Sequence, residues 1–205
     1  MLLIFPFQMA VSKCKPTLYD IKCNPDLPIS VCLSGDSLMA NLAGHLSQAS
    51  GRMVFHDHSQ RGATIGTYSA SPRFHSAVSC RATIKFLWIG SNNLMDRTTG
   101  FAIDNQLLYY AVKRSMEQLS ESGAIVYLIA LPNRYFMDDP RFMPYRRLSA
   151  AFNRHFERFL GERFIKLPPS AYEERAYARD GVHLSADVLN TLARKIRRVV
   201  RAALR

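Results

Sequence analysis

An acid and an imidazole lie three residues apart near the end of the chain, in the segment DGVHLS (180–185). Asp180 can accept a hydrogen bond from one ring nitrogen of His183, and the other ring nitrogen is then free to take a proton from a hydroxyl group. Such a pair could be a surface feature, part of a metal site, or two thirds of a catalytic triad. A triad also needs a nucleophile, and Ser37 in SGDSL (34–38) is the candidate.

Three residues could stabilise the negative charge that develops on an attacked carbonyl oxygen. Ser37 is expected in a tight turn that opens a helix, where its own N–H group points outward; the alternative is that Asp36 or Ser37 only caps the helix. Gly62 would let a backbone N–H group approach a ligand closely, unless it is a plain turn residue. The side-chain amide of Asn92 could reach a substrate oxygen, unless it belongs to an Asn-rich turn.

The elements between these residues decide whether they can meet. From residue 29 onward, short apolar runs alternate with longer amphipathic segments, which predicts alternating strands and helices. We expect strands at 29–35, 52–56, 83–90, 124–132 and 163–167. We expect helices at 37–49, within 69–80, and at 105–123, 144–161 and 185–204. This alternation indicates an α/β domain, a three-layer α/β/α sandwich with a mostly parallel sheet of about five strands. In such a sheet ligands bind beyond the carboxyl ends of the strands, where the candidate residues lie.

The order of these segments resembles that of the SGNH hydrolases, also called the GDSL esterase/lipase family. SGDSL looks like the first block of the family, which carries the nucleophile, and DGVHLS looks like the last, which carries the acid and the base. RGAT (61–64) and IGSNN (89–93) resemble the second and third blocks, which carry a glycine donor and an asparagine donor. The resemblance indicates an N-terminal arm or extension (1–28) followed by an SGNH-hydrolase-like domain (29–205).

The resemblance implies a flavodoxin-like fold and a serine esterase that hydrolyses a carboxyl ester with an acetyl or other short acyl group. Ser37 would be the nucleophile, His183 the base and Asp180 the acid. The oxyanion hole would consist of Ser37, Gly62 and Asn92. The substrate would be a small ester, and no cofactor or metal ion is implied.

One position departs from the pattern of the family. Asn93 stands where the family usually has an aspartate, which has a supporting rather than a catalytic role. The departure concerns the rigidity of its loop and the level of activity more than the type of reaction. The loops at 91–104 and 133–144 are expected to shape the substrate pocket. Candidates to line it are Phe101, Tyr135, Phe136 and Met137.

Histidine and cysteine residues outside these segments could bind a metal ion. His56 and His58 in FHDHS would lie on one face of a strand, but the sequence offers no third ligand, so we predict no metal site. No cysteine pair has the C-x-x-C spacing of zinc and redox sites. Cys32 lies in an apolar run and is expected to be a buried thiol. A Cys14–Cys23 disulfide would require that the protein be exported.

The net charge of +11 is concentrated at the C-terminal end, where residues 134–205 contribute +8. A basic surface of this kind suggests nucleic acid or an anionic lipid surface as a partner. The alternative is a solvated face, with the apolar stripe of the last helix packed on the sheet and its arginines in water. A second function therefore stays open: a nucleic-acid-binding module on an SGNH-like scaffold, from a retroelement or viral protein, with weak or no esterase activity.

The start of the chain is apolar but does not match a targeting segment. No stretch approaches the roughly 18 apolar residues that a membrane span needs. The segment MLLIFPFQMA lacks a basic n-region and a clear cleavage site. We therefore expect no membrane span, and a cytoplasmic or otherwise intracellular location.

Overall fold

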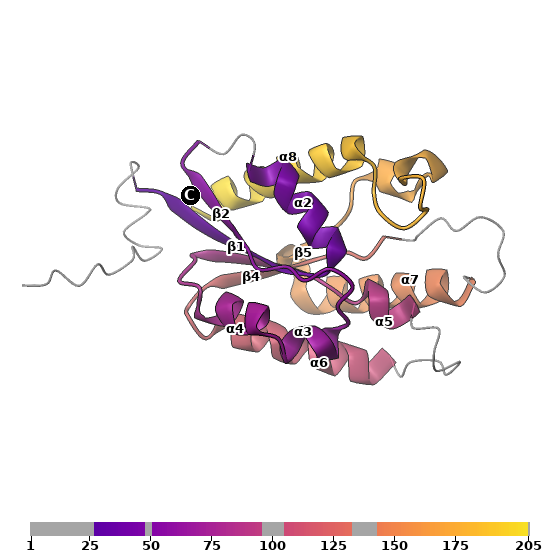
Figure 1. The fold of residues 1–205 in the computed structure, drawn as a ribbon, viewed down its shortest axis with the longest axis horizontal. Coiled ribbons are helices and arrows are strands. Elements are labelled where there is room, and N and C mark those ends of the chain that lie inside the picture. Colours follow the sequence, from indigo (N-terminus) through magenta and orange to yellow (C-terminus); the bar gives the residue numbers. More distant parts are fainter. Residues whose placement is uncertain (1–26, 48–50, 96–104, 133–142, 205) are drawn as a thin grey trace, which may run out of the picture.

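The computed structural model describes residues 27–47, 51–95, 105–132 and 143–204 (Figure 1). Within them, five strands form one sheet in the order β2-β1-β3-β4-β5, and every neighbouring pair is parallel. The strands are β1 (Ile29–Gly35), β2 (Met53–Asp57), β3 (Ile84–Trp88), β4 (Ile125–Ile129) and β5 (Phe164–Ile165). The predicted parallel sheet is confirmed.

Helices cover both faces of this sheet and complete the three layers (Figure 1). α2 (Ser37–Ser47) and α8 (Ala186–Ala203) pack on each other over one face. The other face carries α3 (Ile65–Ser69), α4 (Pro72–Ser79), α5 (Ser91–Met95), α6 (Asn105–Ser120) and α7 (Met143–Leu160). The described residues also form the 3-10 turns η2 (Gly161–Arg163), η3 (Pro169–Tyr172) and η4 (Glu174–Ala176). The predicted α/β/α sandwich is therefore confirmed as well.

Two helices were not expected, and the third, fourth and fifth strands are shorter than predicted. α3 and α5 were not expected, because five residues each are too short to show a helical period. The fourth strand ends at Ile129 rather than at residue 132. The reason is that the backbone N–H and C=O groups of Leu131 bond to the side chain of Asn153 on α7, at 2.8 and 2.9 Å, and not to a neighbouring strand.

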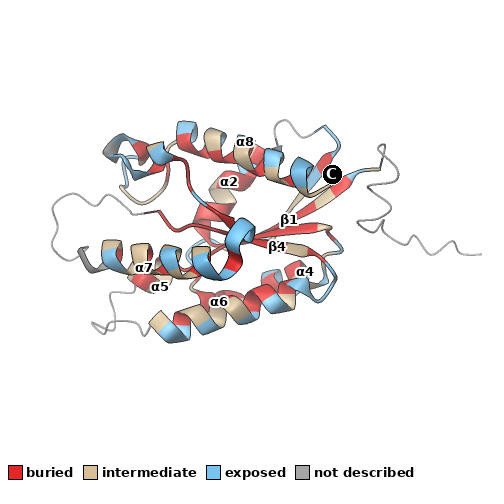
Figure 2. Ribbon diagram, turned by 180° about the vertical axis from the view of Figure 1, so that it is seen from behind, coloured by how far each residue is buried: buried red, intermediate tan, exposed pale blue. Residues whose placement is uncertain are grey.

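The core is formed by strands that are covered on both faces, as Figure 2 shows by their burial. All five residues of β3 are buried. Trp88 is fully buried, and its indole N–H donates to the Ala130 carbonyl oxygen at 2.9 Å, so it is a packing residue as expected. Lys85 is also fully buried, and its ammonium group donates to the carbonyl oxygens of Ala77 and Val78 at the end of α4, both at 2.9 Å.

The closing helix α8 is amphipathic, as its sequence predicts. Its apolar stripe is buried, and the helix packs on α2. Two of its cations bind backbone carbonyl groups. Arg197 donates to the carbonyl oxygens of His45 and Leu46 at the end of α2, and Lys195 donates to that of Lys166. In the part of the chain that the structure describes, no helix is long and apolar enough to cross a membrane.

The strand order places a topological switch between β1 and β3. From β1 the chain passes through α2 on one face to β2, and from β2 it passes through α3 and α4 on the opposite face to β3 (Figure 1). The segments that leave β1 and β3 therefore diverge to opposite faces. In open parallel sheets ligands bind at this point, beyond the carboxyl ends of the two strands. Ser37 follows β1 there, and Asn92 follows β3.

Candidate active site

A close approach of two strands positions Ser37. Gly35, with φ +147°, ends β1 so near to β3 that a Cβ atom on it would lie 2.0 Å from the Trp88 carbonyl oxygen. The next backbone N–H group, of Asp36, donates to the same oxygen at 3.1 Å. The Asp36 carboxylate accepts from the Leu38 N–H group at 2.9 Å, so Asp36 is the residue that caps α2. The Ser37 hydroxyl takes no part in the capping contact, and the residue is only 8% exposed.

The loop before α8 brings His183 to this serine. The Nε2 atom of His183 lies 3.0 Å from Ser37 Oγ, across 146 positions of sequence. Its Nδ1 atom lies 2.6 Å from Asp180 Oδ2. The other carboxylate oxygen of Asp180 accepts from the backbone N–H groups of Val182 and His183, both at 2.9 Å. The structure thus brings together a hydroxyl, an imidazole and a carboxylate in one chain of hydrogen bonds.

The charge on Asp180 determines the direction of these hydrogen bonds. Burial raises the pKa of this carboxyl group, but the hydrogen bonds from the His183 ring and from two backbone N–H groups outweigh that effect and lower the pKa to about 2. Asp180 is therefore ionised at neutral pH and can only accept hydrogen bonds. The proton of a neutral His183 ring must then be on Nδ1, which leaves Nε2 as the acceptor for the Ser37 hydroxyl.

The loop after β2 carries Gly62, which is exposed and has φ +73°. Gln60 N–H donates to the Gly35 carbonyl oxygen at 2.8 Å, which ties the loop to the turn before Ser37. On the far side of Gly62, the side-chain amide of Asn92 donates to the Ala63 carbonyl oxygen at 2.9 Å. An amide group has two hydrogens, so Asn92 keeps one for another acceptor. Three of the predicted segments are therefore connected at one edge of the sheet, while the oxyanion role of Gly62 and Asn92 stays a prediction.

Comparisons with known proteins concern the fold as a whole. No protein-family profile and no curated protein matches the sequence. Solved structures do match the fold: a GDSL-like lipase from Bacteroides thetaiotaomicron (TM-score 0.68, 14% identity, 85% of this chain and 88% of that one) and a carbohydrate acetylesterase from Sinorhizobium meliloti (TM-score 0.64, 16% identity, 85% and 99%). A mutant of an acetyl-xylooligosaccharide esterase from Geobacillus gives a TM-score of 0.66 at 14% identity over 85% of this chain and 96% of that one.

The chain has the SGNH-hydrolase fold. The family pattern that the sequence resembles has an aspartate at the position of Asn93. Here Asn93 Oδ1 accepts from the Ile65 N–H group at 2.8 Å, at the first residue of α3. An uncharged oxygen thus supports the loop after β2, a role that requires an acceptor but no charge. The sequence pattern indicated position 93 as a supporting residue, but only the structure shows that its partner is the Ile65 N–H group.

The sequence-based search for metal ligands missed one group of side chains. The sequence offered no third ligand beside His56 and His58, but the described residues contain a cluster of Cys32, His58 and Cys80, whose ligand atoms lie within 4.8 Å of one another. The carboxylate of Asp57 is directed elsewhere, because it accepts from the N–H and hydroxyl groups of Ser59. Cys32 is a fully buried free thiol, as expected.

Several expectations fall on residues outside the described part of the chain. They are nearly all of the N-terminal arm (1–28), both members of the Cys14–Cys23 pair, and the pocket candidates Phe101, Tyr135, Phe136 and Met137.

Proposed function

We propose that the protein is a serine hydrolase that cleaves carboxyl esters, with Ser37 as nucleophile, His183 as base and Asp180 as the acid that orients it. The observation that carries the proposal is the 3.0 Å separation of His183 Nε2 from Ser37 Oγ, combined with the 2.6 Å separation of His183 Nδ1 from Asp180 Oδ2. Ser37 is separated from Asp180 and His183 by most of the chain. If Asp180 and His183 were only a surface pair, nothing would require the fold to bring Ser37 next to them.

The reaction would proceed in two halves. Ser37 Oγ attacks the ester carbonyl carbon while its proton passes to His183 Nε2. The tetrahedral intermediate collapses, the alcohol leaves with the proton from His183, and the acyl group stays on Ser37. A water molecule then gives a proton to His183 and attacks the acyl group, which releases the carboxylic acid and restores the serine. The ionised Asp180 stabilises the His183 imidazolium in both halves.

The oxyanion would be held by three donors: the backbone N–H groups of Ser37 and Gly62 and the side-chain amide of Asn92. Ser37 is the first residue of α2, so its N–H group has no acceptor within the helix. Gly62 is exposed, and Asn92 has one amide hydrogen beyond the one that it donates to Ala63. Donors that are already oriented before the substrate arrives stabilise the transition state without a reorganisation cost.

An acetyl or other short acyl group is the substrate that we propose. Two of the structures with the same fold are described as an acetyl-xylooligosaccharide esterase and a carbohydrate acetylesterase. The proposal concerns the acyl part of the ester and not its alcohol part.

Hydrolysis of p-nitrophenyl esters with acyl chains from acetyl to octanoyl would test the proposal. We expect the acetyl ester to give the highest kcat/KM, and Ser37→Ala to lower kcat by about 10⁴-fold or more. Ser47→Ala is the matched control, because Ser47 is the exposed serine at the opposite end of the same helix. A fluorophosphonate should label the wild type and the control, but not Ser37→Ala. Undiminished hydrolysis by Ser37→Ala would refute the mechanism.

The nucleic-acid-binding alternative finds no specific support. Of the basic residues in α8, Arg197 and Lys195 are engaged with backbone carbonyl oxygens, as described above. Arg194 donates to the hydroxyl of Thr191 on its own helix. We therefore interpret this face of α8 as a solvated surface, on which Arg197 also binds carbonyl groups at the end of α2.

A further inference from the structure

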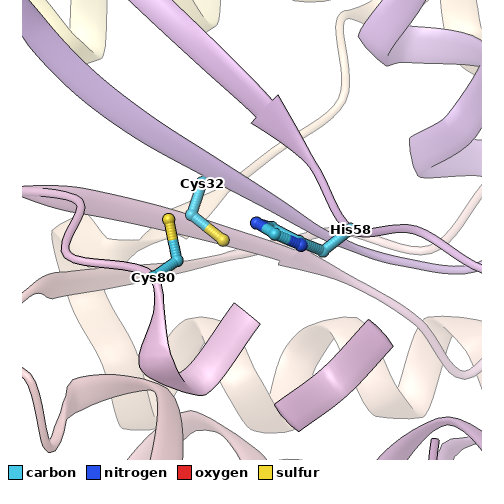
Figure 3. A group of neighbouring side chains, drawn as sticks. All are labelled: Cys32, His58 and Cys80. Atoms are coloured by element: carbon cyan, nitrogen blue, oxygen red, sulfur yellow. The ribbon is translucent and has the colours of Figure 1, made fainter. Parts of the chain in front are cut away.

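Three segments of the chain place sulfur and nitrogen atoms close together near the end of α4 (Figure 3). Cys32 comes from the middle of β1, His58 follows β2, and Cys80 is the residue that ends α4. One ligand atom from each lies within 4.8 Å of the other two. Cys32 is fully buried, while His58 and Cys80 are half-buried.

The sheet register explains why this face holds polar atoms. Cys32 pairs with His56 on β2 and with Lys85 on β3, so these side chains point to the same face of the sheet. α4 covers that face: the Cys32 thiol lies 3.9 Å from the Ala77 carbonyl oxygen, which also accepts from Lys85. The side chains are therefore fixed by two strands and one helix, which is the rigidity that a ligand set requires.

The His58 ring is oriented as a ligand would be. Figure 3 shows it pointing toward the two sulfur atoms. Its Nε2 atom is buried and has no hydrogen-bond partner among the residues that the structure describes. Buried side-chain nitrogens are nearly always satisfied, so an atom of this kind indicates a missing partner. The backbone of the same residue is held on both sides, because its N–H donates to Leu33 and its carbonyl accepts from the Tyr68 hydroxyl.

The donor set selects the class of metal. Two thiols and one imidazole suit soft or borderline ions such as Zn²⁺. They are also compatible with the tetrahedral coordination that zinc prefers. Tetrahedral zinc, with bonds of about 2.3 Å to sulfur and about 2.0 Å to nitrogen, places its ligands about 3.5 to 3.8 Å apart. The observed upper limit of 4.8 Å requires that the side chains move together by only about 1 Å, which rotation about χ1 can supply.

The charges nearby favour a thiolate-rich site. Lys85 places a buried ammonium group close to Cys32 and Cys80, and a dication held by neutral groups would be repelled by it. Two thiolates neutralise the charge of a Zn²⁺ ion, so the bound cluster would add no net charge beside Lys85.

We propose that Cys32, His58 and Cys80 form a binding site for Zn²⁺, with three protein ligands and a fourth position open to water. The site is independent of ester hydrolysis, since none of its ligands belongs to the catalytic set. Its occupant would tie β1 and the end of α4 to the loop after β2, which continues from His58 to Gly62. The metal would therefore stabilise the fold around that loop.

Cobalt and zinc titrations of the reduced protein would test the site. The background is Cys14→Ser/Cys23→Ser, which leaves Cys32 and Cys80 as the only thiols. With a phosphine reductant present, we expect one equivalent of Co²⁺ to produce sulfur-to-cobalt charge-transfer absorption and the visible bands of tetrahedral cobalt. Zn²⁺ should displace the cobalt and raise the unfolding temperature. Calorimetry against a competing chelator would give the affinity.

Variants of the two half-buried ligands would identify the donors. Cys80→Ser and His58→Gln should each weaken zinc affinity by about 100-fold or more, because even changes outside the ligand shell cost 10- to 100-fold. The matched control is His75→Gln, an exposed histidine on α4 that bonds only within its own helix. Circular dichroism would verify that each variant is folded. The proposal fails if the background protein binds no stoichiometric metal, or if its binding is equally strong in both ligand variants.

Discussion

Replacing Asp180 with asparagine tests whether the hydrogen-bond chain works as the geometry indicates. The carboxylate accepts three hydrogen bonds: two from the backbone N–H groups of Val182 and His183, and one from His183 Nδ1. In Asp180→Asn, the carbonyl oxygen can retain both backbone bonds. The amide nitrogen then faces Nδ1 at the position where Asp180 Oδ2 now lies 2.6 Å away. Because that nitrogen is a donor, Nδ1 must become an acceptor and the ring proton must move to Nε2.

The displaced proton removes the base. Nε2 would then present a donor to Ser37 Oγ across 3.0 Å, so it could no longer accept the serine proton. In a Ser-His-Asp triad, the wrong tautomer lowers kcat by about 10⁴-fold. That factor corresponds to about 5 kcal/mol of activation free energy. The fold should be little affected, because Asp180 is 49% exposed and its backbone contacts are kept.

The assay is steady-state hydrolysis of p-nitrophenyl acetate, with the thermal unfolding midpoint measured on the same samples. Asp187→Asn is the matched control, because Asp187 is an exposed acid in the first turn of α8 with no part in the hydrogen-bond chain. We expect wild-type kcat in the control and the large loss in Asp180→Asn alone. If Asp180→Asn stays folded and keeps kcat within about tenfold of the wild type, Asp180 does not determine the tautomer of His183, and the reasoning is wrong.

Four further outcomes are expected. Asn92→Ala should lower kcat for the acetyl ester by about 100- to 1000-fold with little change in KM, as loss of one oxyanion donor does; an unchanged kcat would remove Asn92 from the oxyanion hole. Gly35→Ala should abolish soluble expression or greatly lower the unfolding temperature, because the new Cβ atom would lie 2.0 Å from the Trp88 carbonyl oxygen. Asn93→Ala should lower the free energy of unfolding by about 1 to 3 kcal/mol, since it leaves a buried N–H group without an acceptor, whereas Asn93→Asp should stay near the wild-type value in urea denaturation. The pKa of Asp180 is lowered from 3.8 to about 2, so its contribution to stability is present above about pH 4 and is lost as the pH falls through about 2. In urea titrations across that range, Asp180→Asn should lose less stability than the wild type.

Much of the fold could be predicted because the strands are continuous apolar runs. β1 and β3 are buried on both faces and have helices on either side, so composition and spacing alone indicate a parallel sheet. The details that were missed depend on single polar contacts. α3 starts with the paired side chains of Thr64 and Thr67, and the end of β4 is determined by Asn153 on α7. A propensity argument cannot anticipate a bond between residues far apart in the sequence.

The two groups of functional residues differ in how far sequence reasoning could reach. Ser37 and His183 each follow a predicted strand, and parallel strands bring their carboxyl ends to one edge, so their meeting could be expected. No comparable rule predicts that Cys32, His58 and Cys80 lie together. Cys32 is in the interior of a strand and Cys80 ends a helix, so their proximity depends on the strand register and on where α4 crosses the sheet.

The loop after β2 joins both groups, and its many backbone contacts explain how one short segment can serve each of them. The N–H groups of His58 and Gln60 donate to carbonyl oxygens of β1, at Leu33 and Gly35, each at 2.8 Å. These bonds continue the parallel pairing of β1 with β2 beyond the last residue of β2. The loop therefore leaves the sheet edge at a defined point beside the turn that carries Ser37. From there two side chains of α5 hold the loop: Asn92 just before α3, and Asn93 at the first residue of α3.

The loop is thus anchored at both ends, and these contacts involve neither a metal ion nor a charge. They should keep Gly62 in position whether or not His58 has a bound ion. Loss of zinc should consequently appear in stability and leave catalysis in place.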